Sequence, residues 1–267
     1  MDILKRAMAP ISDAAWSEIE AEAVRTLRGN LSARGLVDFA GPSGWEKAAV
    51  NLGSLKLGEK VLVKGVDWGI RQVQPLIELR VPFSLDIWEL DNVDRGNPAP
   101  ELEPVTEAAA KIALFEETAV YQGFAAAGIK GLCQSAGRAL PLPKDAGQVP
   151  AAIEDGVLTL QKRGVEGPYQ LVLGTEAHRL VMAGDSQGYP LSRRVRELVG
   201  SDIKWSPALE TGVLTSRRGG DFVFTCGQDL ALGWHAHDTK KVELYLTESF
   251  TFQVLDPAAA VAFAWKG

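Results

Sequence analysis

Cysteine is scarce in this sequence, which contains only Cys133 and Cys226 among 267 residues. Two thiols cannot provide the disulfide framework of a small secreted protein, so we expect both to stay reduced, as in cytosolic proteins. The first residues, Met1 to Arg6, lack the apolar core of a signal peptide. No run of about 18 apolar residues occurs, so neither a membrane span nor a membrane partner is expected.

Positive charge is also in short supply. The chain carries 28 Lys and Arg against 34 Asp and Glu, which gives a net charge of -6. An acidic balance disfavours a nucleic-acid partner, because phosphate backbones select basic surfaces. The hydrophobic share of 46% and the charged share of 23% are typical of a globular chain, and the length suits one large or two modest domains.

Catalytic signatures are missing as well: the sequence has no GxSxG, HExxH, GxxxxGK(S/T) or paired CxxC motif. His235 and His237 could share one face of a strand, but no third ligand is near, so solvated histidines are favoured. Glu116 and Glu117 have no histidine three residues later, which argues against a di-iron site. Four acids lack EF-hand spacing and indicate a solvated or arginine-paired loop: Asp86, Glu89, Asp91 and Asp94. The sequence predicts no catalytic residue and no metal site.

The strongest pattern that is present lies in the last fifty residues. Apolar side chains occupy even positions there and polar ones odd positions, as in half-buried antiparallel strands: Val242, Leu244, Leu246, Phe250, Phe252 and Val254. Glu248 alone breaks the rule, so we expect a bulge or a buried polar contact at that position. Shorter alternating runs at 222–226 and 230–234 precede it, and a polar turn is predicted over 235–240.

Two upstream helices are candidates to cover this sheet. Ser12 is a good N-cap, and a helical stripe follows it at spacings of three and four: Trp16, Ile19, Ala23, Leu27 and Leu31. This stripe fits either ordinary core packing or a lid over a groove. A longer helix is predicted over 104–125, with Pro104 at its start, and we take it as the spine that covers the sheet.

Residues 50–72 are predicted to form a long hairpin. Leu52, Leu55 and Leu57 lead into a turn at Gly58-Glu59, and Val61 and Val63 lead out of it. An isolated two-stranded ribbon is marginal in water, so this one should pack on something else, such as another subunit.

The following segment, residues 75–83, is also strand-like. Between about 132 and 216 the pattern changes to a compact α/β insert. It has predicted helices at 149–163, 175–183 and 191–199, and strands near 170–173, 202–205 and 212–216.

Several motifs, in order along the whole chain, resemble the type 1 encapsulin family, whose members were once called linocin-like bacteriocins. They are Leu4-Lys5-Arg6 with Ala9-Pro10, Gly41-Pro42 with Gly44-Trp45-Glu46, Pro75-Leu76-Ile77-Glu78-Leu79-Arg80, Trp88-Glu89-Leu90-Asp91-Asn92 with Arg95-Gly96, Glu166-Gly167-Pro168-Tyr169, Arg218-Gly219-Gly220-Asp221-Phe222, Gly227-Gln228-Asp229-Leu230 and Thr247-Glu248-Ser249-Phe250-Thr251-Phe252-Gln253.

The resemblance implies an α+β fold of the HK97 phage-capsid type. Residues 1–48, 73–133 and 217–267 would form the P-domain with its N-terminal helix, residues 49–72 the E-loop and residues 134–216 the A-domain. It also implies a cytoplasmic, self-assembling icosahedral shell of about sixty copies that is not itself an enzyme. The alternatives are a phage-type major capsid protein and a bacteriocin or protease-like enzyme, for which we find no nucleophile and base.

The resemblance further implies a cargo enzyme that carries a short C-terminal targeting peptide. A dye-decolorising peroxidase and a ferritin-like iron oxidase are the two candidates. The peptide groove would lie between the N-terminal helix and the C-terminal sheet. One wall matches Leu27, Leu31, Arg34 and Asp38, and the other matches Asp229, Leu230, Leu232 and Trp234. The family often has tyrosine where Trp234 stands.

Two further sites follow from the resemblance alone. Some members bind a flavin such as FMN beside a tryptophan and an arginine, which match Trp88 and Arg80, although no cofactor is required. The loop that lines a fivefold pore matches Asp185, Ser186, Gln187, Gly188 and Tyr189. Some relatives have histidine where Gly188 stands.

Overall fold

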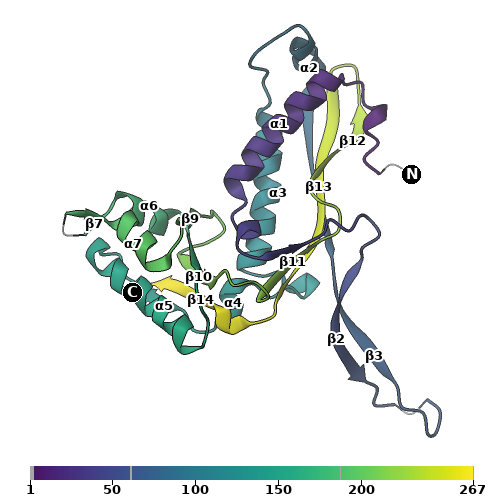
Figure 1. The fold of residues 1–267 in the computed structure, drawn as a ribbon. Coiled ribbons are helices and arrows are strands. Elements are labelled where there is room, and N and C mark those ends of the chain that lie inside the picture. Colours follow the sequence, from purple (N-terminus) through teal and green to yellow (C-terminus); the bar gives the residue numbers. More distant parts are fainter. Residues whose placement is uncertain (1–2, 61, 187, 267) are drawn as a thin grey trace.

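The alternating C-terminal segment forms β13 (Lys241–Val254), the strand around which the larger sheet is built. The computed structural model describes residues 3–60, 62–186 and 188–266 (Figure 1). Along one edge β13 pairs with β12 (Ala231–His237) and then with β11 (Phe222–Cys226), and along the other with β4 (Ile77–Asp86), all antiparallel. The short β1 (Asp38–Ala40) adds to β11 in parallel. The predicted strands are confirmed, but β12 runs three residues into the segment predicted as a turn at 235–240.

Two long helices cover one face of this sheet (Figure 1). The first, α1 (Asp13–Asn30), begins where Ser12 Oγ accepts a hydrogen bond from Ala15 N at 3.1 Å, as its N-cap role predicts. The second, α3 (Glu103–Tyr121), is the predicted spine helix but ends four residues early. Gly123 has a φ of +91° and sits against the backbone of Ile129 and Gly131, a turn that an α-helix cannot contain.

The even-numbered side chains of β13 lie on its helix-covered face. The odd-numbered Tyr245, Thr247 and Thr251 are buried as well, so the half-buried strand that the alternation predicts is wrong. Even-numbered side chains from β13 pack with the stripes of α1 and α3 in one hydrophobic cluster. Its members include Ile19, Ala23, Leu27, Ala108, Ile112, Leu232, Leu244 and Leu246. Glu248 has the same parity, so it points to the same covered face and is fully buried. The expected polar contact is therefore real, whereas the register shift of this sheet lies elsewhere, between Trp234 and Ala236.

A second sheet lies in the α/β part. Its order is β5 (Leu140–Leu142), β14 (Ala260–Trp265), β10 (Gly212–Ser216), β6 (Tyr169–Leu173) and β9 (Lys204–Trp205). Three helices pack on it as predicted: α5 (Val149–Lys162), α6 (Thr175–Ala183) and α7 (Leu191–Val199). The C-terminal strand β14 belongs to this sheet, although the predicted division placed all of 217–267 with the first. An apolar strand fits either sheet, and pairing between distant segments decides where it goes.

Short elements complete the chain. The α-helices are α2 (Ile87–Asp94) and α4 (Leu132–Ser135), and the two-residue strands are β7 (Asp185–Ser186) and β8 (Tyr189–Pro190). The 3-10 turns are η1 (Arg6–Met8), η2 (Ala33–Gly35), η3 (Ala125–Ala127), η4 (Ala146–Gln148) and η5 (Pro257–Ala259). Helix α2 begins where the Asp86 side chain accepts a hydrogen bond from Trp88 N, a cap that the sequence reading missed.

The predicted hairpin exists as β2 (Ala49–Leu57) and β3 (Gly69–Pro75), which project from the body of the molecule (Figure 1). The tight turn predicted at Gly58-Glu59 is wrong, because the return strand starts only at Gly69. Trp68 closes the long connection instead: its Nε1 donates to Lys60 O at 2.7 Å and its ring lies against Gly58. Val63 lies outside both strands, and Val61 lies outside the described residues.

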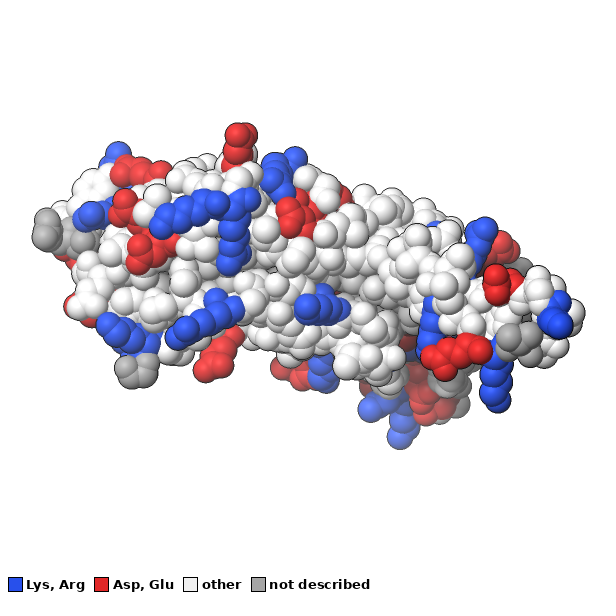
Figure 2. Space-filling view, turned by 90° about the horizontal axis from the view of Figure 1, so that it is seen from below, with Lys and Arg blue, Asp and Glu red and all other residues white. Residues whose placement is uncertain are grey.

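The surface gives no sign of a single-sign electrostatic field on the face shown in Figure 2, where acidic and basic side chains are interspersed. Within residues 3–60, 62–186 and 188–266, no helix combines the length and hydropathy that crossing a bilayer requires.

Candidate functional site

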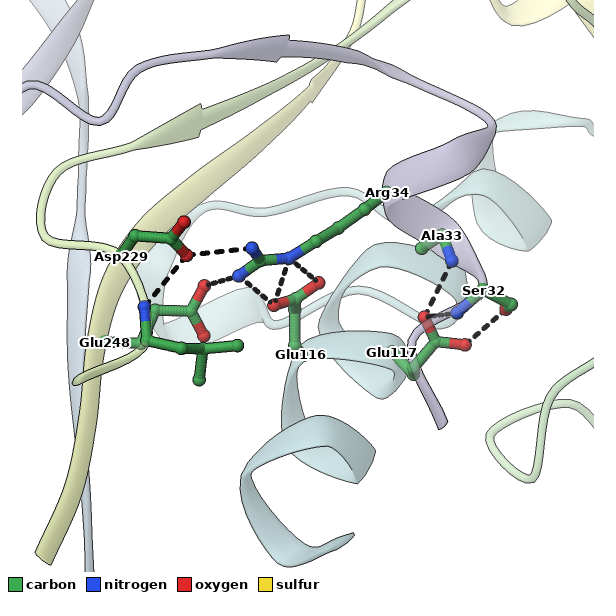
Figure 3. Close-up of polar contacts among 8 residues, drawn as sticks. Ser32, Ala33, Arg34, Glu116, Glu117, Asp229 and Glu248 are labelled. Carbon is green, nitrogen blue, oxygen red and sulfur yellow. Dashed lines mark hydrogen bonds and ion pairs between the residues drawn. The ribbon is translucent and has the colours of Figure 1, made fainter. Parts of the chain in front are cut away.

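Arg34 is the centre of a buried ionic cluster that joins four distant segments of the chain (Figure 3). It projects from η2, just after α1. Its Nη2 lies 2.8 Å from Glu116 Oε2 on α3 and 2.6 Å from Glu248 Oε1 on β13. Its Nη1 lies 2.8 Å from Asp229 Oδ1 in the connection between β11 and β12. We call Arg34, Glu116, Asp229 and Glu248 the Arg34 cluster.

Aromatic rings enclose the Arg34 cluster. The guanidinium carbon lies 5.3 Å from the ring centroids of both Phe39 and Phe224. Burial disfavours the charged form of Arg34, but the hydrogen bond and charge of Glu116, with the charge of Glu248, raise its pKa above the usual value. Burial, together with the neighbouring charge of Glu116, raises the pKa of Glu248 well above its usual range, against the pull of Arg34.

The neighbouring carboxylate, Glu117, fixes the turn that carries Arg34. It accepts hydrogen bonds from the backbone N–H groups of Ser32 at 2.8 Å and Ala33 at 2.7 Å, and from the hydroxyl of Ser206 at 2.6 Å. Burial raises the pKa of Glu117. Ser32 Oγ also lies 2.7 Å from the Tyr121 hydroxyl. Two adjacent acids on α3 therefore bind the segment that follows α1. Glu117 binds its backbone, and Glu116 binds Arg34.

The eight predicted peptide-groove residues divide into three sets. Leu27 and Leu232 are only 7% and 5% exposed and belong to the core. Leu31, Leu230 and Trp234 are partly exposed and pack against that core, so they supply the accessible apolar wall.

The polar members of the predicted groove already have partners. Arg34 and Asp229 bind each other in the Arg34 cluster. Asp38 lies apart from them, on β1, where its Oδ2 accepts a hydrogen bond from Gly220 N at 2.6 Å. The Asp229 side chain keeps 40% exposure, so a visiting cation could still reach it.

The N-terminal segment lies along the β12 edge, which the sequence reading did not anticipate. Trp234 N donates to Leu4 O at 2.8 Å, and the Tyr245 hydroxyl donates to Ile3 O at 3.0 Å. Arg6 stacks over the Trp16 ring at 4.3 Å and pairs with Glu20 at 2.6 Å. In the sequence, the only indication of this contact was Arg6, a basic residue four positions before Pro10.

The two predicted flavin residues do not meet within one chain. Trp88 is 67% exposed on α2, and Arg95 lies 5.4 Å from its ring centroid. Arg80 stacks instead over Tyr245 at 4.3 Å, farther along β4.

The predicted pore loop forms the tight β7–β8 hairpin. Gly188 has a φ of +80°, and its N–H donates to Asp185 Oδ1 at 2.7 Å. The Tyr189 hydroxyl donates to Glu197 at 2.8 Å. Ser186 pairs with Tyr189 across the hairpin, and Gln187 lies outside the described residues.

Comparison with known proteins decides the family. A family model described as "Encapsulating protein for peroxidase" matches residues 1–251. The chain belongs to the encapsulin family. It is 46% identical over 268 residues to the type 1 encapsulin shell protein of Rhodospirillum rubrum, covering 98% of this chain and 96% of the relative. It is 39% identical to that of Mycobacterium tuberculosis, covering 99% of this chain and all of the relative.

Solved structures agree on the fold. The virus-like particle of Pyrococcus furiosus matches with a TM-score of 0.64 at 14% identity, covering 93% of this chain and 99% of that one. The Gordonia phage Cozz structure matches with a TM-score of 0.56 at 13% identity, covering 89% and 87%. The predicted α+β fold of the HK97 capsid type is confirmed. This encapsulin is a shell protein with a capsid-like fold.

The first prediction concerns Glu248. Because the pKa of Glu248 is raised in the folded state, its bound proton stabilises the fold. This stabilisation is fully present at pH values below the usual carboxyl pKa. That stabilisation is lost as pH rises through the raised value. Glu248→Gln removes this carboxyl, so the free energy of unfolding should lose up to about 1.4 kcal/mol per pH unit of its dependence on pH. Thermal unfolding in metal-free buffer, from about pH 5 to pH 9, measures it.

The matched control is Glu243→Gln, an exposed acid on the same strand, which should keep the wild-type slope. Glu117, also buried, contributes its own slope to all three proteins. An unchanged slope in Glu248→Gln would contradict this account of the Arg34 cluster.

Proposed function

We propose that this encapsulin assembles into a closed icosahedral shell of about sixty copies that holds a cargo enzyme in the cytoplasm. The observation that carries this proposal is the ribbon β2–β3. Among the described residues, nine of the eighteen exposed large hydrophobic side chains lie on its strands or on the connection between them: Leu52, Leu55, Leu57, Leu62, Val63, Val66, Trp68, Ile70 and Val73. An exposed apolar surface of this extent marks a contact with another chain.

The ribbon cannot bury this surface by itself, because two strands have no second layer to pack against. A neighbouring copy supplies that layer in a shell. Each copy packs its ribbon against one neighbour and is covered by the ribbon of another. All these contacts form only when the rotation that relates successive copies produces a closed assembly. The capsid-type fold of the solved relatives supports this arrangement.

The cargo enzyme would enter by a short C-terminal peptide rich in aliphatic residues with one basic residue. Leu31, Leu230 and Trp234 offer the partly exposed apolar wall, and Asp229 offers the acid at its edge. Two or three buried aliphatic side chains contribute roughly 1.5–3 kcal/mol each. Ordering the free tail offsets much of this gain. Single-site affinity is then about micromolar, and retention rests on the several tails of an oligomeric cargo.

The class of cargo is a dye-decolorising peroxidase or a ferritin-like iron oxidase. The matched family description, which names a peroxidase, supports the first. Small substrates would cross the shell at the β7–β8 hairpins gathered around each fivefold axis, where Asp185 and Tyr189 lie. A flavin at Trp88 is optional in this scheme.

Deleting residues 53–66 should leave a folded subunit that cannot close shells, because it removes much of the surface that the neighbour covers. Size-exclusion chromatography with negative-stain imaging separates shells from free subunits. The control is Lys56→Ser, which changes a polar position on the same strand and should keep shells intact. Intact shells from the deletion would place the assembly contact elsewhere.

Leu230→Asp should give intact but poorly loaded shells, since it sets an unpaired charge in the apolar wall. Leu232→Asp is a poorer test, because Leu232 is in the core and its loss would disturb folding. The readout is the cargo-to-shell ratio after co-expression with the native partner. Leu255→Asp, at a 58% exposed position, should load normally. Normal loading by Leu230→Asp would move the peptide site.

For the flavin, the absorbance spectrum of purified shells gives the readout. If a flavin is bound, Trp88→Ala should reduce its visible absorbance, because the exposed ring is the stacking platform. Trp45→Ala provides a tryptophan control away from α2. Undiminished flavin absorbance in Trp88→Ala shells would contradict the assignment of Trp88.

A further inference from the structure

Three side chains beside Arg34 converge from different parts of the sheet. Cys226 ends β11, Asp229 follows in the next connection, and Glu248 lies on β13. Their ligand atoms, the cysteine Sγ and one oxygen from each carboxylate, all lie within 4.8 Å of one another. Such spacing allows a single ion to contact all three.

Arg34 occupies only one oxygen of each carboxylate. It binds Asp229 Oδ1, which also accepts from Leu230 N, and it binds Glu248 Oε1. The other oxygen of Glu248, Oε2, is buried and has no hydrogen-bond partner among the described residues. A buried and unpaired carboxylate oxygen is rare in folded proteins and calls for a ligand or a proton.

The charges around this position are unbalanced. Glu116 from α3, Asp229 and Glu248 bring three carboxylates, and Arg34 from η2 brings one positive charge. A divalent cation would supply the missing positive charge.

We propose that Cys226, Asp229 and Glu248 form a binding site for a borderline divalent transition-metal ion, Zn²⁺ or one of similar softness. A thiolate with two carboxylates suits this class of ion, whereas Mg²⁺ and Ca²⁺ take oxygen ligands. Arg34 binds one oxygen of each carboxylate and fixes the orientation of both groups, as supporting hydrogen bonds do in known metal sites. The half-exposed Asp229 marks the side from which an ion and a completing water would enter.

Cysteine binds a metal ion as a thiolate, so the Cys226 S–H proton leaves to solvent as the ion takes its place. The site goes beyond the proposed shell and cargo roles, because the ion would tie β11, the following connection and β13 together.

The test uses intact, metal-stripped protein and Co²⁺ as an optical probe. Titration should produce a thiolate-to-cobalt charge-transfer band that saturates at one ion per subunit and disappears when Zn²⁺ is added. Cys226→Ser should abolish the band. Cys133→Ser, which changes the other, half-buried cysteine, should keep it. Light scattering checks that particle size is unchanged.

Asp229→Asn provides a second variant, at the most exposed acid of the Arg34 cluster, and thermal unfolding checks that it still folds. It should weaken Co²⁺ binding by at least roughly 10- to 100-fold, the range for disturbed metal sites. The proposal is overturned if wild-type protein gives no band, or if the band survives Cys226→Ser or is lost in Cys133→Ser. If Cys226→Ser does not fold, unchanged affinity in Asp229→Asn would likewise overturn it.

Discussion

The structure depends on one buried guanidinium. Arg34 binds Glu116, Asp229 and Glu248, and so joins the end of α1 to the spine helix, to the β11–β12 connection and to β13. Removing Glu116 or Glu248, the two fully buried partners, typically costs about 3–5 kcal/mol, because the remaining charge stays largely buried and unpaired. The same contacts fix the distance between α1 and the sheet, which are the two walls of the proposed cargo groove. The geometry of that groove therefore depends on residues that the peptide need not touch.

The rest of the molecule consists of a body that buries its own apolar side chains and a ribbon that does not. The body buries the stripes of α1 and α3 against β13 and packs a second sheet under α5, α6 and α7. The ribbon β2–β3 leaves its apolar side chains in solvent. In the proposed shell, a neighbouring copy covers these side chains.

Local patterning allowed much of the body to be predicted. The parity of β13 identified its helix-covered face and singled out Glu248, although the other face is buried too. The helices α5, α6 and α7 were placed to within a residue. Features that arise from distant contacts were not predictable. The partner of Glu248, Arg34, lies 214 positions away. Burial of Leu232, the sheet chosen by β14 and the closure of the ribbon by Trp68 likewise depend on neighbours that no local spacing reveals.

The central claim is that this chain closes into a hollow shell through its ribbon while the Arg34 cluster holds the groove on the inner surface. Electron cryomicroscopy of purified particles tests this most directly. The account predicts hollow icosahedral particles of about sixty copies. In them, Leu55 and Leu57 are covered by a neighbouring copy, and Leu31, Leu230 and Trp234 face the interior. Particles whose ribbons remain in solvent, or whose groove faces outward, would contradict it.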